Sequence, residues 1–163
     1  MPSVAGQTVV ITGAAQGLGA AIARAFAAQG ARLVLIDCDT NGLTSLKAEL
    51  GDDIATLSVD LSDAEATAQA LTELPPTVDT LIHNAAILVP RPLEAETLES
   101  FRVTLDVGIQ AGFQLTKAVW PGMRRAGGGA LIFVSSRSGI EGFVDETAYC
   151  AAKHALEGFS KCL

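Results

Sequence analysis

The stretch TVVITGAAQGLGA, residues 8–20, decides the fold because an apolar run passes directly into a glycine-rich turn. TVVIT (Thr8–Thr12) is typical of a buried strand, and a helical pattern follows the turn. Gly13, Gly17 and Gly19 stand between strand and helix, where glycine lets the backbone turn sharply and approach a ligand. The N-terminus of a helix offers free N–H groups and a positive dipole end, so the stretch predicts a site for a nucleotide pyrophosphate.

The spacing of these glycines narrows the kind of nucleotide site. It is GxxxGxG, whereas dinucleotide-binding domains commonly carry GxGxxG. A P-loop would need Lys and then Ser or Thr where this chain has Ala20 and Ala21, so the sequence does not favour a nucleoside triphosphatase. A glycine turn that only lets a helix pack on a strand remains open as the structural alternative.

Short apolar runs alternate with helical patterns along the rest of the chain. Four more strands are expected, at Arg32–Asp37, Ala55–Asp60, Thr80–Ala85 and Ala130–Ser136. Helices are expected at Leu18–Gln29, at Gly42–Leu50, from a capping Ser62 to Leu74, near Glu96–Phe101, at Leu105–Arg125 and from Thr147 to Leu163. Continuously apolar strands that alternate with helices predict a parallel α/β sheet covered on both faces. Neither repeats nor linkers are evident, so residues 1–163 are predicted to be one domain.

The composition argues against several classes of partner. The net charge is −7 and Lys and Arg do not cluster, which disfavours nucleic acid and an anionic membrane surface. No apolar run approaches the roughly 20 residues that span a bilayer, and the first residues lack the basic region of a signal peptide. Cys38, Cys150 and Cys162 are widely spaced, without a CxxC pair or a Cys/His cluster. We therefore expect reduced thiols, a cytoplasmic location and no metal site.

Two aspartates follow predicted strands at positions suited to a dinucleotide. At the end of the second strand, Asp37 could accept hydrogen bonds from a ribose diol and would repel a 2′-phosphate. The glycine turn has no Arg or Lys to bind such a phosphate, since its variable positions are Ala14, Ala15 and Gln16. The sequence therefore favours NAD over NADP, with a solvated acid at a strand end as the alternative. Asp60 ends the third strand in the same way and could meet the adenine edge or form a local turn.

The last predicted helix carries a pair of residues suited to acid–base chemistry. Tyr149 and Lys153 lie four residues apart, so they share one face of the helix. Free tyrosine loses its proton only near pH 10, but a nearby cation favours the phenolate. Ser136, at the end of the fifth strand, could donate a hydrogen bond to a substrate oxygen at the edge where open α/β sheets bind ligands. Because YxxxK alone is common on solvated helices, the prediction depends on the whole set of residues.

This set resembles the short-chain dehydrogenase/reductase family over essentially the whole chain. The residues that carry the resemblance are TGAAQGLG (Thr12–Gly19), Asp37, VDLS (Val59–Ser62), HNAAI (His83–Ile87), VSS (Val134–Ser136) and YCAAK (Tyr149–Lys153). The resemblance implies a Rossmann-type, doubly wound parallel sheet in three α/β/α layers. It also implies nicotinamide-dependent oxidation of an alcohol or reduction of a ketone or aldehyde.

The resemblance also assigns roles to individual residues. Tyr149 is expected to be the general acid/base, and Ser136 to orient the substrate oxygen. Lys153 is expected to favour the tyrosinate and to hold the nicotinamide ribose. The predicted cofactor-binding residues are Gly13, Gln16, Gly17, Leu18, Gly19, Asp37, Asp60, Leu61, Asn84, Ala85, Ala86, Tyr149 and Lys153.

The chain departs from the family pattern in three ways. His83 replaces the first Asn of the usual Asn-Asn-Ala-Gly, and we interpret it as a tolerated wall residue. Gly108 stands where the family has a catalytic Asn that helps to hold a water path to the lysine. Complete members also continue beyond the Tyr/Lys helix with further strands and a substrate-covering segment, so we expect the domain to be incomplete at its C-terminal end and to lack C-terminal strands.

Two functions therefore stay open beside each other. The first is an NAD-dependent dehydrogenase or reductase, and the second is a non-catalytic nucleotide-binding fragment. A methyltransferase would share the glycine turn but would not require Ser136, Tyr149 and Lys153 together. The expected partners are a small alcohol or carbonyl substrate and further copies of the chain, in a homodimer or homotetramer formed by the Leu105–Arg125 and Tyr149 helices. Acidic residues of Gly139–Thr147 disfavour an anionic substrate.

Overall fold

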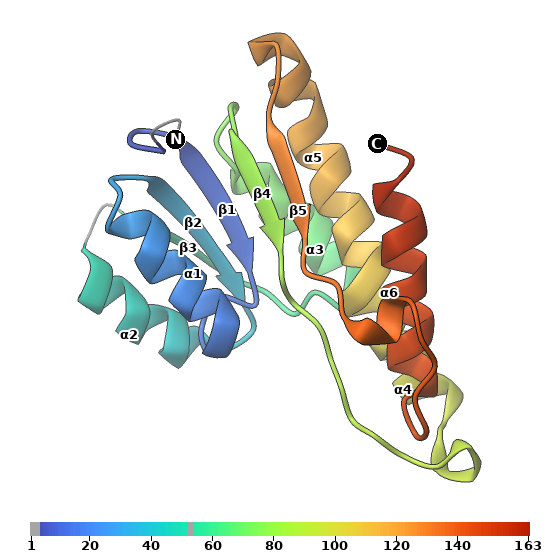
Figure 1. The fold of residues 1–163 in the computed structure, drawn as a ribbon. Helices are drawn as coiled ribbons and strands as arrows, with labels where there is room; N and C mark the ends of the chain where they lie inside the picture. Colours follow the sequence, from blue (N-terminus) through green and yellow to red (C-terminus); the bar gives the residue numbers. More distant parts are fainter. Residues whose placement is uncertain (1–3, 52–53) are drawn as a thin grey trace.

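The centre of the computed structural model, which describes residues 4–51 and 54–163, is a five-stranded parallel sheet. Its strands are β1 (Thr8–Thr12), β2 (Arg32–Asp37), β3 (Ala55–Ser58), β4 (Thr80–His83) and β5 (Ala130–Phe133). They are ordered β3-β2-β1-β4-β5, and every neighbouring pair is parallel (Figure 1). The carboxyl ends of all five strands therefore meet at one edge, which is where such sheets bind ligands.

Helices cover both faces of the sheet, as the predicted doubly wound α/β/α fold requires (Figure 1). They are α1 (Gly17–Ala27), α2 (Thr40–Leu50), α3 (Ala64–Ala70), α4 (Leu98–Leu105), α5 (Ala111–Ala126) and α6 (Thr147–Ser160). Helices α1 and α2 lie on one side, and α3 and α5 lie on the other. Beyond the sheet edge, a long segment follows β4 away from the body of the molecule before the chain returns through α4.

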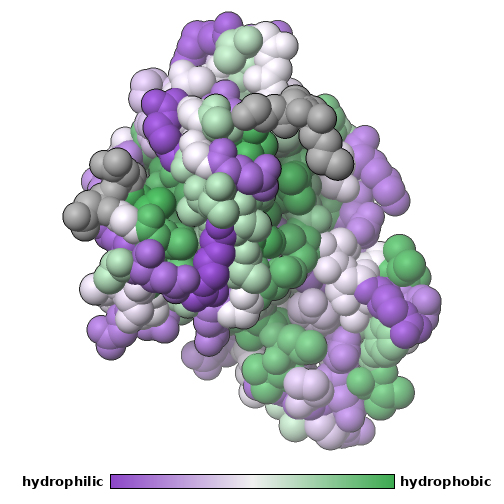
Figure 2. All heavy atoms as spheres, turned by 60° about the vertical axis from the view of Figure 1, so that its left-hand side comes forward, coloured by the Kyte–Doolittle hydropathy of each residue, from purple (hydrophilic) through white to green (hydrophobic). Residues whose placement is uncertain are grey.

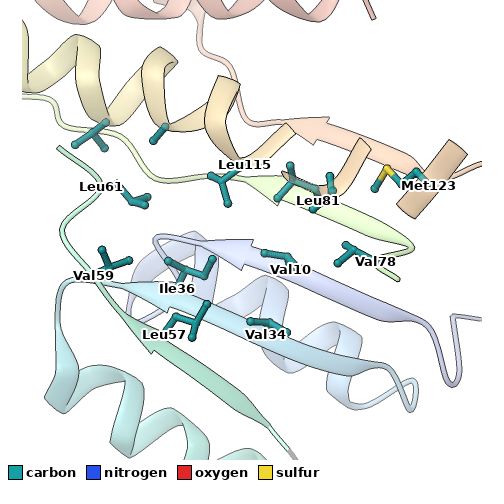
Figure 3. Packing of buried hydrophobic residues seen from close by; sticks show 13 residues of the cluster. Val10, Val34, Ile36, Leu57, Val59, Leu61, Val78, Leu81, Leu115 and Met123 are labelled. Carbon is teal, nitrogen blue, oxygen red and sulfur yellow. The ribbon is translucent and has the colours of Figure 1, made fainter. Parts of the chain in front are cut away.

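The alternation of side chains along the strands divides the core into two clusters. On β1, Val9 and Ile11 pack toward the α1 and α2 side, whereas Val10 packs toward α5. Figure 3 shows the cluster that contains Val10. It lies between the sheet and α5, which contributes Leu115 and Met123. Full burial of such a side chain is worth roughly 1.5–3 kcal/mol, so these two layers hold the sheet edge, and any site on it, in a fixed frame.

Three strands are shorter than predicted. They end at Ser58, His83 and Phe133, not at Asp60, Ala85 and Ser136. Beyond β4 the backbone leaves the ladder because the amides of Asn84 and Ala85 donate to the Thr12 hydroxyl, at 3.1 and 3.0 Å. The residues that were placed at the last strand positions therefore lie in the loops that follow the sheet edge.

Helix boundaries also differ from prediction. The observed α1 and α2 begin at Gly17 and Thr40 rather than at Leu18 and Gly42. Ser62 does not cap α3, because the Asp63 carboxylate accepts from the amides at the start of that helix. The prediction that the last helix continues to Leu163 was wrong, since α6 ends at Ser160.

The expectation about a signal peptide rested partly on residues 1–3, which lie outside the described residues.

The middle of the chain contains a feature that the sequence did not reveal. The two helical stretches predicted near Glu96–Phe101 and at Leu105–Arg125 are α4 and α5, joined without a break by a π-helical turn at Asp106–Gln110. A π-helical turn is rare and often occurs near functional sites. This one contains Gly108, one of the two residues that depart from the family pattern.

Candidate functional site

The glycine turn after β1 allows two close backbone approaches. Gly13 has a φ of +63°, and a Cβ there would lie 2.9 Å from the Asn84 Nδ2 atom. A Cβ on Gly19 would overlap the Gly13 carbonyl oxygen. Close packing therefore requires glycine at both positions, and the same turn leaves the N-terminus of α1 open at the sheet edge.

Asn84 ties the glycine turn to the end of β4. Its side-chain amide donates to the carbonyl oxygens of Thr12 and Gly13, at 3.0 and 3.1 Å. The amide is thus used to shape the turn, which lies 71 residues away in the chain. Asn84 therefore has a structural role in addition to the role that the sequence predicted for it in the cofactor wall.

A cleft of about 320 Å³ opens at the carboxyl edge of the sheet, between the glycine turn and the ends of β2, β3 and β4. Eight of the predicted cofactor-binding residues line it, namely Gly13, Gln16, Asp37, Asp60, Leu61, Asn84, Ala85 and Ala86. Sequence reasoning missed the other lining residues, which are Cys38, Val59, Ile87 and Val107. Of the remaining predicted residues, Gly17, Leu18 and Gly19 form the first turn of α1, and Tyr149 and Lys153 lie on α6.

The carboxylate of Asp37 is fixed in this cleft by two backbone amides. Its Oδ2 atom accepts from the Ala15 amide at 2.9 Å, and its Oδ1 atom accepts from the Asp39 amide at 3.0 Å. Burial, followed by the neighbouring Asp37 charge, raises the pKa of the adjacent Cys38 thiol. The carboxylate therefore presents a negative charge of defined orientation beside the cleft.

Asp60, the second predicted aspartate, forms a local turn. Its Oδ1 atom accepts from both the amide and the hydroxyl of Ser62, at 2.9 and 2.8 Å. The turn interpretation is thus realised, while Asp60 still lines the cleft. The two possibilities predicted for this residue are compatible with each other.

Lys153 is buried on the inner side of α6. Its Nζ atom donates to the Val134 carbonyl oxygen at 2.6 Å and lies 5.5 Å from the centroid of the Tyr149 ring. Burial lowers the pKa of Lys153, because a desolvated ammonium is less stable than a hydrated one. The structure therefore brings Tyr149 and Lys153 together as predicted, with the lysine held by the loop that follows β5.

Ser136 belongs to a chain of polar groups that leads to α6. It precedes a 3-10 turn, its Oγ atom accepts from the Ser138 amide at 3.2 Å, and the two serine hydroxyls are 3.3 Å apart. The buried Ser138 hydroxyl donates to the Glu146 carboxylate at 2.8 Å. Sequence reasoning missed Ser138, although its position two residues after Ser136 in SSRSG was a visible signal.

A second hollow adjoins the cleft at the sheet edge. Ile87 lines both spaces, and the second is completed by the segment after β4 and by Tyr149, Asp145 and Glu146. The amide of Arg91 donates to the Asp145 carbonyl oxygen at 2.8 Å, which ties this segment to the loop before α6. In Figure 2 hydrophobic side chains gather in the recess between the main body and the projecting lower lobe. The second hollow has a volume of only about 10 Å³, and it places polar and apolar side chains together beside Tyr149.

Within residues 4–51 and 54–163, no group of three or more His, Cys, Asp or Glu residues is arranged to hold a metal ion. No helix in the same ranges is long and apolar enough to cross a membrane.

Comparison with known proteins adds independent findings. A model of the short chain dehydrogenase family matches residues 7–163. The chain is 34% identical to the D-threitol dehydrogenase of Mycolicibacterium smegmatis, covering 97% of this chain and 63% of that protein. It is 35% identical to the L-xylulose reductase of Bos taurus, covering 98% of this chain and 65% of that protein.

A solved structure agrees with these relatives in fold. The crystal structure of a metagenomic short-chain oxidoreductase in complex with NADP superposes with a TM-score of 0.90 at 32% identity, covering 99% of this chain and 76% of that one. The chain therefore spans less than two thirds of the length of the two curated relatives, although nearly all of it matches them.

Proposed function

Because the chain belongs to the short-chain dehydrogenase family, we propose that the protein is a nicotinamide-dependent oxidoreductase that interconverts an alcohol and its carbonyl compound. The observation that carries this proposal is the contact of the buried Lys153 ammonium with the Tyr149 ring. A structural lysine would be expected to reach solvent or a carboxylate, whereas this one is held by a backbone carbonyl next to the tyrosine.

The residues of the cleft fit a nicotinamide dinucleotide. The open start of α1 suits a pyrophosphate, and the oriented Asp37 carboxylate suits a ribose diol. The bound cofactor would supply or accept a hydride. We propose NAD as the preferred cofactor because a 2′-phosphate would meet the Asp37 charge, even though a relative of this fold binds NADP.

The protein's own groups would then manage the proton. In the direction of reduction, the Tyr149 hydroxyl donates its proton to the carbonyl oxygen, and the adjacent Lys153 ammonium stabilises the tyrosinate that forms. When substrate binds, the Ser136 hydroxyl turns its one proton from the Ser138 oxygen, 3.3 Å away, to the same substrate oxygen and so orients it. A positioned acid–base group of this kind typically contributes about 10²–10⁴-fold in rate.

We propose that the substrate is a polyol or its keto form. Two relatives named for threitol and xylulose support this class. Asp145 and Glu146 line the hollow beside Tyr149, so the Glu146 carboxylate can accept hydrogen bonds from substrate hydroxyls. The two carboxylates would also disfavour an anionic substrate.

The test is Tyr149→Phe, measured with a panel of polyols and ketoses and with NAD(H) and NADP(H). We expect cofactor affinity to change little and turnover to fall by about 10²-fold or more. Normal turnover in the variant would refute the catalytic assignment. Cofactor binding by the unaltered protein without turnover of any polyol, ketose, simple alcohol or ketone would instead support the non-catalytic nucleotide-binding alternative.

A further inference from the structure

His83 is buried at the end of β4, and both of its ring nitrogens have a partner. The side chain is 1% exposed. Its Nδ1 atom lies 3.0 Å from the Thr12 hydroxyl oxygen, and its Nε2 atom lies 3.1 Å from the Gly108 carbonyl oxygen. A Cβ on Gly112 would lie 3.0 Å from the ring, so the imidazole fits a narrow slot beside α5.

The hydrogen bonds around the ring determine one tautomer. A carbonyl oxygen only accepts, so the proton must lie on Nε2 and is donated to Gly108. The Nδ1 atom must then accept the Thr12 hydroxyl proton. The Thr12 oxygen in turn accepts from the amides of Asn84 and Ala85. Every group in this chain is satisfied by a neutral His83, and a tolerated wall residue would not require such an arrangement.

The two ends of this chain of hydrogen bonds, at Thr12 and at Gly108, lie at different parts of the site. Thr12 is the last residue before the glycine turn, whose carbonyls are also held by Asn84. Gly108 lies in the π-helical turn, and a Cβ at this position would lie 3.0 Å from the Cβ of Ala152. Ala152 immediately precedes Lys153, so the turn packs directly against the part of α6 that carries the lysine.

We propose that His83 is a positioning residue that fixes the π-helical turn against α6 and so sets the place of Lys153 relative to the glycine turn. The sequence departures at His83 and Gly108 are then parts of one arrangement, in which a side chain from β4 holds the backbone of the turn. This inference rests on the proposed oxidoreductase function, because Lys153 is the group whose position it controls.

Two substitutions test separately the two hydrogen bonds of the His83 ring, with Gly108 and with Thr12. His83→Gln places an amide near the Nε2 position and can still donate to Gly108, whereas His83→Asn places one near Nδ1 and can still accept from Thr12. We expect His83→Asn to lower turnover by about tenfold and to weaken NAD(H) binding by about threefold, since the displaced Lys153 is proposed both to stabilise the tyrosinate and to hold the ribose. We expect His83→Gln to keep turnover within about threefold and to weaken cofactor binding by about fivefold, because an unsatisfied Thr12 hydroxyl loosens the turn.

The control is His154→Asn, at the other histidine, which is exposed and bonds only a carbonyl of its own helix among the contacts described. This variant should keep both the turnover and the dissociation constant of NAD(H) within about twofold of the unaltered protein. A packing role alone would make the two His83 variants alike in turnover and cofactor affinity, and that result would overturn the proposal.

An independent measurement needs no activity. Nitrogen-15 spectra of the histidine rings should show His83 as a single neutral Nε2–H tautomer, with His154 identified by its variant. An Nδ1–H tautomer, or averaging between tautomers, would also refute the inference. The proposed function fails separately, through normal turnover in Tyr149→Phe, so the two failures are distinguishable.

Discussion

The Lys153 ammonium lies over the ring of Tyr149, 5.5 Å from its centroid, and is anchored from the other side by the Val134 carbonyl. The lysine is buried, and burial lowers its pKa. Its charge is therefore poorly solvated and interacts strongly with any negative charge that develops on the tyrosine oxygen. This geometry underlies the first prediction.

Lys153→Ala should reduce both turnover and cofactor affinity, while Ser136→Ala should reduce turnover alone. The lysine is proposed to stabilise the tyrosinate and to hold the ribose, whereas the serine is proposed to contact only the substrate oxygen. We expect turnover to fall by about 10²-fold or more in both variants, measured by steady-state kinetics beside calorimetric titration of NAD(H). Lys161→Ala, at an exposed lysine beyond α6, is the matched control. Unchanged cofactor affinity in Lys153→Ala would contradict the ribose role.

Replacing Asp37 should change the preference between cofactors. Asp37→Ser removes the charge that would repel a 2′-phosphate, so we expect NADP(H) to bind about tenfold more tightly relative to NAD(H) than in the unaltered protein. Asp39→Ser is the control, because Asp39 caps α2 and does not line the cleft. Calorimetric titration with both cofactors measures the ratio. Tighter binding of NADP(H) than NAD(H) by the unaltered protein would remove the diol role from Asp37.

The stability of the fold should fall in mild acid because of His83. Burial, and then the Lys153 charge, lower the pKa of His83 to about 4, against an ordinary value of 6.5. Between these two pKa values, the unfolded chain binds a proton at His83 and the folded chain does not. The contribution of neutral His83 to the free energy of unfolding is therefore fully present above pH 6.5 and is lost as the pH falls toward 4. Between pH 7 and 5 the linkage amounts to about 2 kcal/mol of unfolding free energy.

Denaturant unfolding at both pH values measures this effect as a difference. Between pH 7 and 5, the free energy of unfolding of His83→Gln should fall by about 2 kcal/mol less than that of the unaltered protein. The contribution of the carboxylates is the same in both proteins and cancels in this difference. His154→Asn serves as the control. Identical pH dependence in the unaltered protein and His83→Gln would show that His83 is not held neutral.

The predicted contact between copies through α5 and α6 is narrower than the sequence suggested. Leu115 and Val119 of α5 are buried in the core, so they offer no surface to a second copy. Phe113 remains 50% exposed and contacts Phe159 of α6 edge to face, and Trp120 is half-buried. These aromatic rings are what remains for an apolar contact.

We expect Phe113→Lys to shift the protein from dimers or tetramers toward monomers, because it places a charge in the centre of that contact. Sedimentation velocity at micromolar concentration measures the change, with Arg125→Ala as a control at an exposed position on another face of the same helix. An unaltered protein that sediments as a monomer would contradict the interface.

Local signals in the sequence were enough to predict the parallel sheet and the neighbourhood of the site. The continuous apolar runs of β1 and β2 and the glycines after β1 act over a few residues, so their meaning does not depend on distant parts of the chain. The same holds for Tyr149 and Lys153, which helical periodicity places on one face. Boundaries were less accurate, because β4 ends where a distant hydroxyl, that of Thr12, captures its next amides.

Tertiary structure alone decided how these parts are joined. The sheet order places β1 beside β4, so Thr12 meets His83 and Asn84 although 71 residues separate Thr12 from His83. The π-helical turn then brings the Gly108 carbonyl to the other side of the His83 ring. No periodicity encodes such contacts, because a hydrogen bond between distant residues exists only after strand order and helix packing have brought its donor and acceptor together.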